Sequence, residues 1–259
     1  MIYALITGAS KGIGKAIAEN LCQKKVNVLL VARSEHLLKE QCDFLSRTYG
    51  INADYLAVDL SIPNAANTIY YWLLQKNYSI NILVNNAGYG LSGSFLKHTF
   101  QQHADMMQVN MTVPVELTSL LLPQLQQQPS AFILNIASSA AYQAVPGLSL
   151  YAASKSFILS FSRGLKYELR NTSVSVTVVC PGATDTDFPN RAEVTSDKAK
   201  KLAAKFNMQP NTVAALAVDA MFDKQAEVVI GFINKMGLFL TWLLPKSVLE
   251  KGAADIYGL

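Results

Sequence analysis

The stretch Thr7-Gly8-Ala9-Ser10-Lys11-Gly12-Ile13-Gly14 decides the fold, because its three glycines join an apolar run to a helical pattern. Glycine lacks a Cβ, so the backbone can turn sharply there and approach a bound group closely. The helix that follows directs unpaired N–H groups and the positive end of its dipole at the turn, which suits a phosphate. A glycine trio alone also fits a purely structural turn. Its place between a first strand and a first helix favours a pyrophosphate-binding loop.

The same alternation of strand and helix continues along the chain. Strands are expected at Ile2–Ile6, Val26–Val31, Ala53–Val58, Ile80–Val84, Ala131–Ile136, Val174–Val179 and Glu227–Ile230. Helices are expected at Gly12–Lys24, Ser34–Tyr49, Pro63–Lys76, Phe100–Gln126, Leu150–Arg170 and Pro210–Phe222. Nearly continuous apolar strands are typical of parallel sheets covered on both faces. The pattern predicts an α/β fold with a doubly wound parallel sheet of seven strands, in one domain over 1–259.

Two segments depart from this rhythm. Residues 185–206 are polar and lysine-rich, and we expect them to form a mobile lid over a substrate. Residues 232–259 form an apolar C-terminal extension, in which Pro245 breaks a helix. We favour packing of this helix on the sheet edge or on another subunit. A wall of an apolar substrate pocket, with Trp242 or a neighbour near the substrate tail, is the sharper alternative. Membrane contact is the weakest of the three interpretations, because the helix carries few cationic residues beside its apolar ones.

Composition narrows the class of protein. The 259 residues are 51% hydrophobic and 15% charged, which is typical of a folded domain with a large core. The net charge of +4 is scattered, so nucleic acid is not expected as a partner. Cys22, Cys42 and Cys180 lie far apart and predict neither a disulfide nor a metal site. With no signal-peptide pattern at the start and no run long enough to span a bilayer, we predict a cytoplasmic protein.

The end of the second strand predicts the cofactor. NAD is usually held there by a carboxylate that accepts from the ribose hydroxyls. This strand ends Val31-Ala32-Arg33-Ser34, so a guanidinium replaces the carboxylate. Arg33, with Lys11 and the Ser34 hydroxyl, suits the 2′-phosphate of NADP(H), although both cations fit an ordinary surface as well. Asp59, in Asp59-Leu60 after the third strand, fits either an adenine contact or a cap of the next helix.

Tyr151 and Lys155 predict acid–base chemistry. They are four residues apart in a helical stretch, so their side chains share one face. A free phenol has a pKa of about 10 and is a poor base near neutrality. A nearby ammonium lowers that pKa, which lets the tyrosine exchange a proton with an alcohol or carbonyl oxygen.

Two polar residues complete the candidate site. Ser138 follows the fifth strand, at the edge where ligands of doubly wound sheets bind, and its hydroxyl can polarise a substrate oxygen. Ser139 is a rival by adjacency. Asn110 interrupts a helical run and, taken alone, fits a cap at a helix break.

Taken together, these motifs resemble the short-chain dehydrogenase/reductase family over Ile2 to about Ile230. The resemblance implies the catalytic residues Asn110, Ser138, Tyr151 and Lys155, with Ser138 chosen because the family places its serine thirteen residues before the tyrosine. It matches Asn85-Asn86-Ala87-Gly88 and Pro181-Gly182-Ala183-Thr184-Asp185-Thr186 to two further motifs. The implied cofactor site comprises Gly8, Ser10, Lys11, Gly12, Ile13, Gly14, Arg33, Ser34, Asp59, Leu60, Asn86, Ala87, Gly88, Tyr151, Lys155, Pro181, Gly182, Thr184 and Thr186.

The resemblance also implies an activity and an assembly. We expect an NADP(H)-dependent oxidoreductase, acting as a reductase of an apolar ketone, aldehyde or 3-oxoacyl-type substrate. Family members form homodimers or homotetramers through the helices that correspond to Asn110–Gln126 and Leu150–Arg170. The alternatives are an NADP(H)-binding regulatory protein with vestigial catalysis and a lipid- or steroid-type dehydrogenase associated with a membrane surface.

Overall fold

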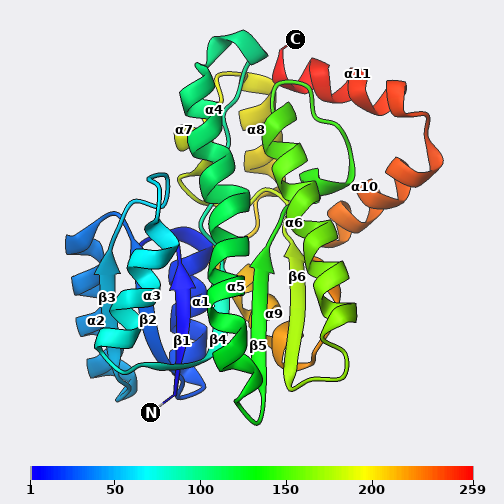
Figure 1. Ribbon diagram of the computed structural model, residues 1–259. Helices are drawn as coiled ribbons and strands as arrows, with labels where there is room; N and C mark the ends of the chain where they lie inside the picture. Colours follow the sequence, from blue (N-terminus) through cyan, green and yellow to red (C-terminus); the bar gives the residue numbers. More distant parts are fainter. Residues whose placement is uncertain (1, 259) are drawn as a thin grey trace.

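A parallel sheet of seven strands forms the centre of the molecule (Figure 1). The computed structural model describes residues 2–258. Met1 and Leu259, the two ends of the predicted domain 1–259, lie outside the described residues, and Leu259 is also the last residue of the predicted C-terminal extension. The strands are β1 (Ile2–Thr7), β2 (Asn27–Ala32), β3 (Ala53–Ala57), β4 (Ser79–Asn85), β5 (Ala131–Ile136), β6 (Val174–Cys180) and β7 (Glu227–Val229). Their order is β3-β2-β1-β4-β5-β6-β7, which confirms the predicted doubly wound architecture.

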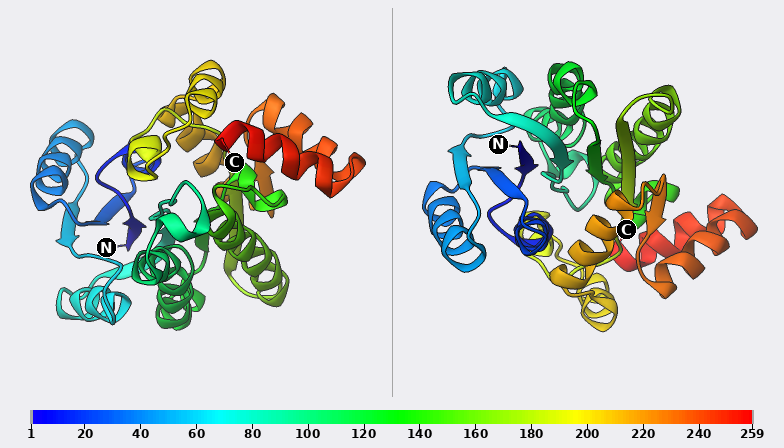
Figure 2. Two further views of the ribbon diagram at one scale, coloured as in Figure 1. Left: turned by 90° about the horizontal axis from the view of Figure 1, so that it is seen from above. Right: turned by 90° about the horizontal axis from the view of Figure 1, so that it is seen from below.

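Helices cover both faces of this sheet (Figure 2). One face packs against α1 (Gly12–Gln23), α2 (Glu35–Tyr49) and α9 (Pro210–Phe222). The other packs against α3 (Ala65–Gln75), α5 (Val113–Gln126) and α6 (Ser149–Glu168). Successive strand residues point to opposite faces, so Ala4 and Ile6 enter the first core while Tyr3 and Leu5 enter the second. Two buried faces explain why the strands are apolar at nearly every position.

The strand order reverses at the centre of the sheet. From β1 the chain builds outward through β2 and β3, then returns to place β4 on the other side of β1. At such a point the two connections leave in opposite directions beyond the carboxyl ends of the strands, and a crevice opens between them. The glycine loop after β1 and the segment after β4 border this crevice.

The prediction of one long helix over Phe100–Gln126 is wrong, because the structure divides this segment into three parts. The structure has α4 (Phe100–Met107), a π-helical turn at Gln108–Thr112, and α5. Asn110 lies in the turn with its side chain 1% exposed, and it bonds to groups outside its own helix. Insertions of this kind are common where a helix must direct a side chain to a functional site. Helical periodicity cannot reveal such an interruption, because the bonding partners lie elsewhere in the fold.

The lid segment, residues 185–206, leaves the sheet between β6 and α9. It contains α7 (Phe188–Arg191) and α8 (Asp197–Phe206). Its two ends are joined, because Asp185 N donates to Met208 O at 2.9 Å and Met208 N donates to Ala183 O at 3.0 Å. The lid is therefore a loop closed at its base.

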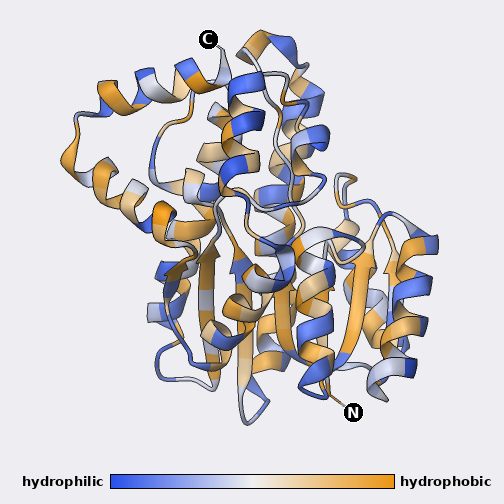
Figure 3. Cartoon of the chain, turned by 180° about the vertical axis from the view of Figure 1, so that it is seen from behind, coloured by the Kyte–Doolittle hydropathy of each residue, from blue (hydrophilic) through white to orange (hydrophobic). Residues whose placement is uncertain are grey.

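The C-terminal extension forms two helices, α10 (Phe232–Leu243) and α11 (Lys246–Tyr257), separated at Pro245 as expected. Figure 1 shows α10 leaving beside β6 and α11 returning above the carboxyl ends of the strands toward α8. Seen from behind, α10 remains coloured as hydrophobic although it lies at the margin of the molecule (Figure 3). Between residues 2 and 258, none of the helices has the length and apolar character needed to cross a bilayer.

Candidate active site

A cavity of about 700 Å³ lies at the carboxyl ends of the strands. It gathers residues from the glycine loop, the ends of β2 to β6, α6 and the lid. Of the predicted site residues it is lined by Gly8, Ser10, Lys11, Gly12, Ile13, Arg33, Ser34, Asp59, Leu60, Asn86, Ala87, Gly88, Ser138, Tyr151, Lys155, Pro181, Gly182, Thr184 and Thr186. Gly14 and Asn110 lie behind this wall, so the structure brings together all the predicted residues except these two.

The glycine loop is held close to the segment after β4. A Cβ on Gly8, whose φ is +66°, would lie 2.8 Å from the Ala87 Cα. A Cβ on Gly14 would collide with Gly8 O and the Asn86 amide. Asn86 Nδ2 donates to Thr7 O at 2.9 Å and to Gly8 O at 3.2 Å. Gly14 thus serves the packing of the loop, and the start of α1 stays open to the cavity.

Arg33 and Asp59 face each other where β2 and β3 end. Arg33 Nη1 lies 3.8 Å from Asp59 Oδ2, and both side chains are substantially exposed. Asp59 Oδ1 accepts from the Ser61 backbone and hydroxyl at 2.9 and 2.8 Å. Burial alone would raise the pKa of Asp59, but the bonds from Ser61 and the charge of Arg33 lower it. Asp59 therefore holds a turn and does not cap α3, whose N-cap is Asn64.

Tyr151, Lys155 and Ser138 meet at the base of the cavity. Both α6 residues are buried, and Lys155 Nζ lies 5.9 Å from the Tyr151 ring centroid. Lys155 donates to Ile136 O at 2.9 Å, which fixes the ammonium under the end of β5. Ser138 and Ser139 both line the cavity, but the hydrogen bond that lowers the pKa of the phenol comes from Ser138.

The protonation states differ from the expectation that Lys155 lowers the phenol pKa. Burial raises the pKa of Tyr151 to about 12, against the smaller effect of the Ser138 bond. Burial also lowers the pKa of Lys155 to about 8. Both shifts have one cause, because a site removed from water disfavours the charged forms of phenol and ammonium alike. The protein alone thus holds Tyr151 as a neutral phenol, ready to donate a proton.

Asn110 reaches the site only through other residues. Its Oδ1 accepts from Tyr89 N at 3.0 Å, and its Nδ2 donates to Tyr89 O at 2.9 Å and Ser154 Oγ at 3.0 Å. These bonds tie the segment after β4 to α6, next to Lys155. A Cβ on Gly88 would lie 3.1 Å from both Asn110 Oδ1 and Lys155 Nζ, so a larger residue at position 88 would press on both side chains. Asn110 is a positioning residue in this arrangement.

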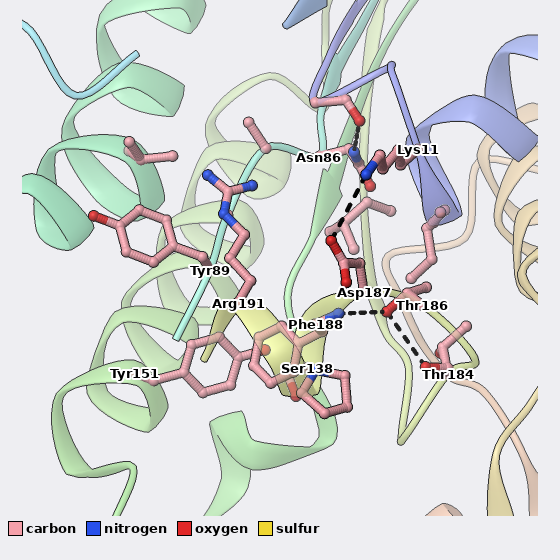
Figure 4. A pocket seen from close by; sticks show the side chains of 18 of the residues that line it. Lys11, Asn86, Tyr89, Ser138, Tyr151, Thr184, Thr186, Asp187, Phe188 and Arg191 are labelled. Atoms are coloured by element: carbon pink, nitrogen blue, oxygen red, sulfur yellow. Dashed lines mark hydrogen bonds and ion pairs between the residues drawn. The ribbon is translucent and has the colours of Figure 1, made fainter. Parts of the chain in front are cut away.

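The lid contributes residues that the sequence did not single out (Figure 4). The Phe188 ring lies 5.2 Å from the Tyr151 ring, centroid to centroid. The Arg191 guanidinium lies 5.0 Å from the Tyr89 centroid, and partial burial together with the charge of Arg33 lowers its pKa. Lys11 lies 3.8 Å from Asp187 of the lid. No periodic signal marks these residues, because their partners belong to distant strands.

The wall next to Tyr151 comes from α11 and not from α10. Tyr257 lines the cavity, whereas no residue of α10 does. Trp242, which the alternative interpretation placed near a substrate, is 81% exposed. The helix break at Pro245 reverses the chain, so α11 and not α10 approaches the lid.

The cavity fits a dinucleotide. Its volume falls within the range of small-molecule sites, it reaches from Arg33 to Tyr151, and the free N–H groups of α1 open into it. The matching family supports this interpretation, because the family model for short chain dehydrogenases covers residues 3–197. The chain belongs to the short-chain dehydrogenase/reductase family.

Named relatives of this short-chain dehydrogenase/reductase include a ketoacyl reductase and a 3-oxoacyl-CoA reductase. The ketoacyl reductase HetN of Nostoc sp. is 30% identical over 257 residues, covering 94% of this chain and 85% of the relative. The very-long-chain 3-oxoacyl-CoA reductase-A of Danio rerio is 32% identical, covering 79% and 66%. Among solved structures, a short-chain dehydrogenase from Sphingobium yanoikuyae in complex with NADPH is 28% identical, with a TM-score of 0.80 and 92% of each chain covered.

Proposed function

We propose that this short-chain dehydrogenase/reductase is an NADP(H)-dependent reductase of an apolar ketone, aldehyde or 3-oxoacyl-type substrate. The observation that carries the proposal is the meeting of Tyr151, Ser138 and Lys155 at the base of the dinucleotide-sized cavity, with Tyr151 buried and Lys155 Nζ 5.9 Å from its ring centroid. A proton donor at this place suits the reduction of a carbonyl better than any other reaction of the site.

The residues divide the work of the reaction. A nicotinamide cofactor, which the glycine loop and the end of β2 would hold, would supply the hydride for the carbonyl carbon. Tyr151 gives its proton to the carbonyl oxygen, so the C=O bond becomes CH–OH and a phenolate remains on the enzyme. The Ser138 hydroxyl polarises that oxygen, and the Lys155 ammonium stabilises the phenolate until a proton returns. Asn110 keeps Tyr89 and α6 in register and touches no reacting atom.

Arg33 supports NADP(H) over NAD(H). The end of β2 carries no carboxylate, and the Arg33 guanidinium borders the cavity beside Ser34. Asp59 Oδ1 is bonded to Ser61, and the pair of Asp59 Oδ2 with Arg33 is long and exposed, so a 2′-phosphate can compete for the Arg33 guanidinium. Arg191 of the lid adds a second guanidinium near Arg33. The relative from Sphingobium yanoikuyae, which was solved with NADPH, agrees with this choice.

The substrate end of the cavity supports an apolar compound. Its lining includes Ala140, Leu148, Val194, Ala199, Ala203 and Tyr257. Carbonyl substrates with an aliphatic chain suit such a wall, and two relatives are named for ketoacyl or 3-oxoacyl-CoA reduction. The cytoplasmic location and the homodimeric or homotetrameric assembly stay predictions.

A spectroscopic screen tests the proposal. The purified protein is mixed with NADPH or NADH and a panel of ketones, aldehydes and 3-oxoacyl thioesters, and loss of reduced-cofactor absorbance is followed. We expect oxidation of NADPH with apolar carbonyls. Arg33→Ala should weaken the binding of NADPH by about ten- to a hundredfold, since a hydrogen bond to a charged group contributes about 1.5–3 kcal/mol. The affinity for NADH should stay nearly unchanged.

Arg47→Ala, at the exposed end of α2, is the matched control and should change the affinity for neither NADPH nor NADH. A preference for NADH in the unmodified protein would overturn the NADP(H) assignment. Tight binding of NADPH without oxidation by any member of the panel would favour a regulatory protein with vestigial catalysis.

A further inference from the structure

Helix α10 presents its apolar side chains away from the protein. Of its twelve residues only Asn234, Leu238 and Thr241 are partly shielded, and the other nine are exposed. Asn234 Nδ2 donates to Ile230 O at 2.7 Å, and Leu238 packs against the small core beside β6. These residues are three and four apart, so one narrow face attaches the helix to the domain. The large apolar residues among the other nine are between 42% and 81% exposed.

The exposed face is wide as well as apolar. It consists of Phe232, Ile233, Met236, Phe239, Leu240, Trp242 and Leu243, and it continues with Leu244 before the break at Pro245 and Val248 after it. At 3.6 residues per turn, the arc from Trp242 to Ile233 covers about 180° of the helix. A helix that packs on another helix or on a sheet needs a stripe of roughly 100°. The apolar arc of α10 therefore exceeds what contact with one further helix would cover.

Positive charge borders this face. Lys235 lies inside the arc near its Trp242 margin, because 3.6 residues per turn place it between Trp242 and Phe239, and Lys246 begins α11. Lys198, Lys201 and Lys205 follow one another at helical spacing and form an exposed stripe on α8. The sequence of the extension itself places few lysines beside its apolar residues. The fold adds the α8 stripe, because Ser196 at the start of α8 donates to Ile256 O of α11.

The three helices lie at the same end of the molecule, beyond the strand ends (Figures 1 and 2). Together α8, α10 and α11 carry the lysines Lys198, Lys200, Lys201, Lys205, Lys235, Lys246 and Lys251 against Asp197, Glu250 and Asp255. This end of the protein is thus both apolar and net positive.

We propose that α10 lies in the surface of an anionic phospholipid membrane. Its apolar arc would enter the boundary between headgroups and acyl chains, and the lysines would face the lipid phosphates. Twelve helical residues extend about 18 Å, less than the roughly 30 Å of a bilayer core, so the helix lies along the surface. Trp242, at 81% exposure, is placed like the tryptophans that favour the interface.

The width of the arc and the flanking charge favour lipid over a second copy of this chain. A membrane can cover half of a helix, whereas an isologous contact of two α10 helices would leave part of the arc in water. Two copies would also bring their lysine stripes toward each other, which is unfavourable. Docking would orient α11, whose Tyr257 lines the cavity, toward the lipid phase.

Vesicle sedimentation tests this proposal with the full-length protein. Vesicles of phosphatidylcholine, with or without phosphatidylglycerol, are pelleted after mixing, and bound protein is measured. We expect binding to the mixed vesicles and weaker binding at high salt. Phe239→Ser/Trp242→Ser should weaken that binding by about tenfold or more. Lys198→Gln/Lys201→Gln/Lys205→Gln should reduce binding only to the vesicles that contain phosphatidylglycerol.

Tyr71→Ser is the matched control. Tyr71 is 60% exposed on α3, far from α10, and its replacement should leave sedimentation unchanged. Oxidation of NADPH with a short, water-soluble ketone should be the same in the Phe239→Ser/Trp242→Ser and Tyr71→Ser variants as in the unmodified protein, which separates this proposal from the proposed function. The fluorescence of Trp242 is obtained by subtracting the spectrum of the Phe239→Ser/Trp242→Ser variant from that of the unmodified protein. Its emission maximum should move to shorter wavelength when vesicles are added.

Two results would overturn the proposal. One is an absence of sedimentation with both kinds of vesicle. The other is a mass of two chains by light scattering that falls to one chain in the Phe239→Ser/Trp242→Ser variant, which would assign the apolar face to a second copy.

Discussion

The two sides of the cavity are held in place by different means. On the floor, formed by the ends of β1, β4 and β5 and the start of α6, buried side chains bond to one another. Asn85 Nδ2 donates to Asn135 Oδ1 at 2.9 Å, and Asn135 Nδ2 donates to Ser162 Oγ at 2.8 Å. Each of these groups would be left without a partner in a site closed to water if its neighbour moved. The floor is therefore rigid.

The lid is attached by a backbone bond between buried residues and by an exposed ion pair. Ser92 N donates to Ala192 O at 2.8 Å, and Lys97 Nζ lies 3.3 Å from Glu193 Oε2 in an exposed ion pair. Exposed pairs of this kind contribute at most about 1 kcal/mol. The contrast predicts that the lid opens more easily than the floor, which would leave the chemistry in the less mobile part of the fold.

The largest effect should come from the floor. Tyr151→Phe keeps the ring against Phe188 but removes the proton, so kcat should fall by about 10²–10⁴-fold while NADPH binding is kept. Steady-state kinetics and fluorescence titration with NADPH measure the two quantities. Ser138→Ala should also lower kcat, whereas Ser139→Ala, its cavity-lining neighbour, should not. Near-normal turnover of Tyr151→Phe would exclude this residue as the acid.

The pH dependence should report Lys155. Its pKa is lowered to about 8, so the ammonium is present below that pH and is lost above it. Tyr151, with a pKa of about 12, stays protonated over the same range. For reduction, kcat/KM should be flat below pH 8 and fall by up to about tenfold per pH unit above it. A flat profile to pH 10 would show that the charge on Lys155 is not needed.

Stability should separate two glycines. Gly14→Ala places a Cβ against Gly8 O, and backbone must move, so the free energy of unfolding should fall by about 1–3 kcal/mol. A Cβ on Gly164, within α6, meets nothing within 4 Å. Gly164→Ala should raise the free energy of unfolding by about 0.5–1 kcal/mol. Denaturant titration of both proteins checks this, and equal effects would contradict the tight packing of the glycine loop.

The smallest effect should come from the lid. Amide hydrogen exchange should be faster in residues 185–206 than in β5, and NADPH should slow it in the lid alone. Lys97→Ala should speed exchange in the lid without cofactor by no more than about fivefold, the limit for an exposed ion pair. Lys76→Ala, which removes the exposed pair with Asp54, is the control and should leave the lid unchanged. Exchange that is equally slow in lid and β5 would remove the contrast.

Sequence predicted the fold because the signals were local. Each strand of the sheet is a short apolar run, and Ala131–Ile136 and Pro210–Phe222 have the predicted bounds. The cavity-lining residues were predicted for the same reason, since glycines and polar groups that follow strands must gather at one edge of a parallel sheet.

What sequence missed depends on contacts between distant segments. The π-helical turn at Asn110 exists because its amide bonds to Tyr89 and Ser154. Phe188 and Arg191 enter the cavity because the lid folds back over the sheet. The phenol pKa was misjudged because Tyr–Lys spacing gives proximity but not burial, and burial dominates both groups.

The closed base of the lid has a consequence for how such enzymes diverge. Because Ala183 and Asp185 bond to Met208, the intervening loop can lengthen, shorten or change sequence without altering β6 or α9. The family model ends at residue 197, inside this loop. Divergence of substrate range can accumulate there while the inherited floor stays constant, so one ancestral reaction can serve many different compounds.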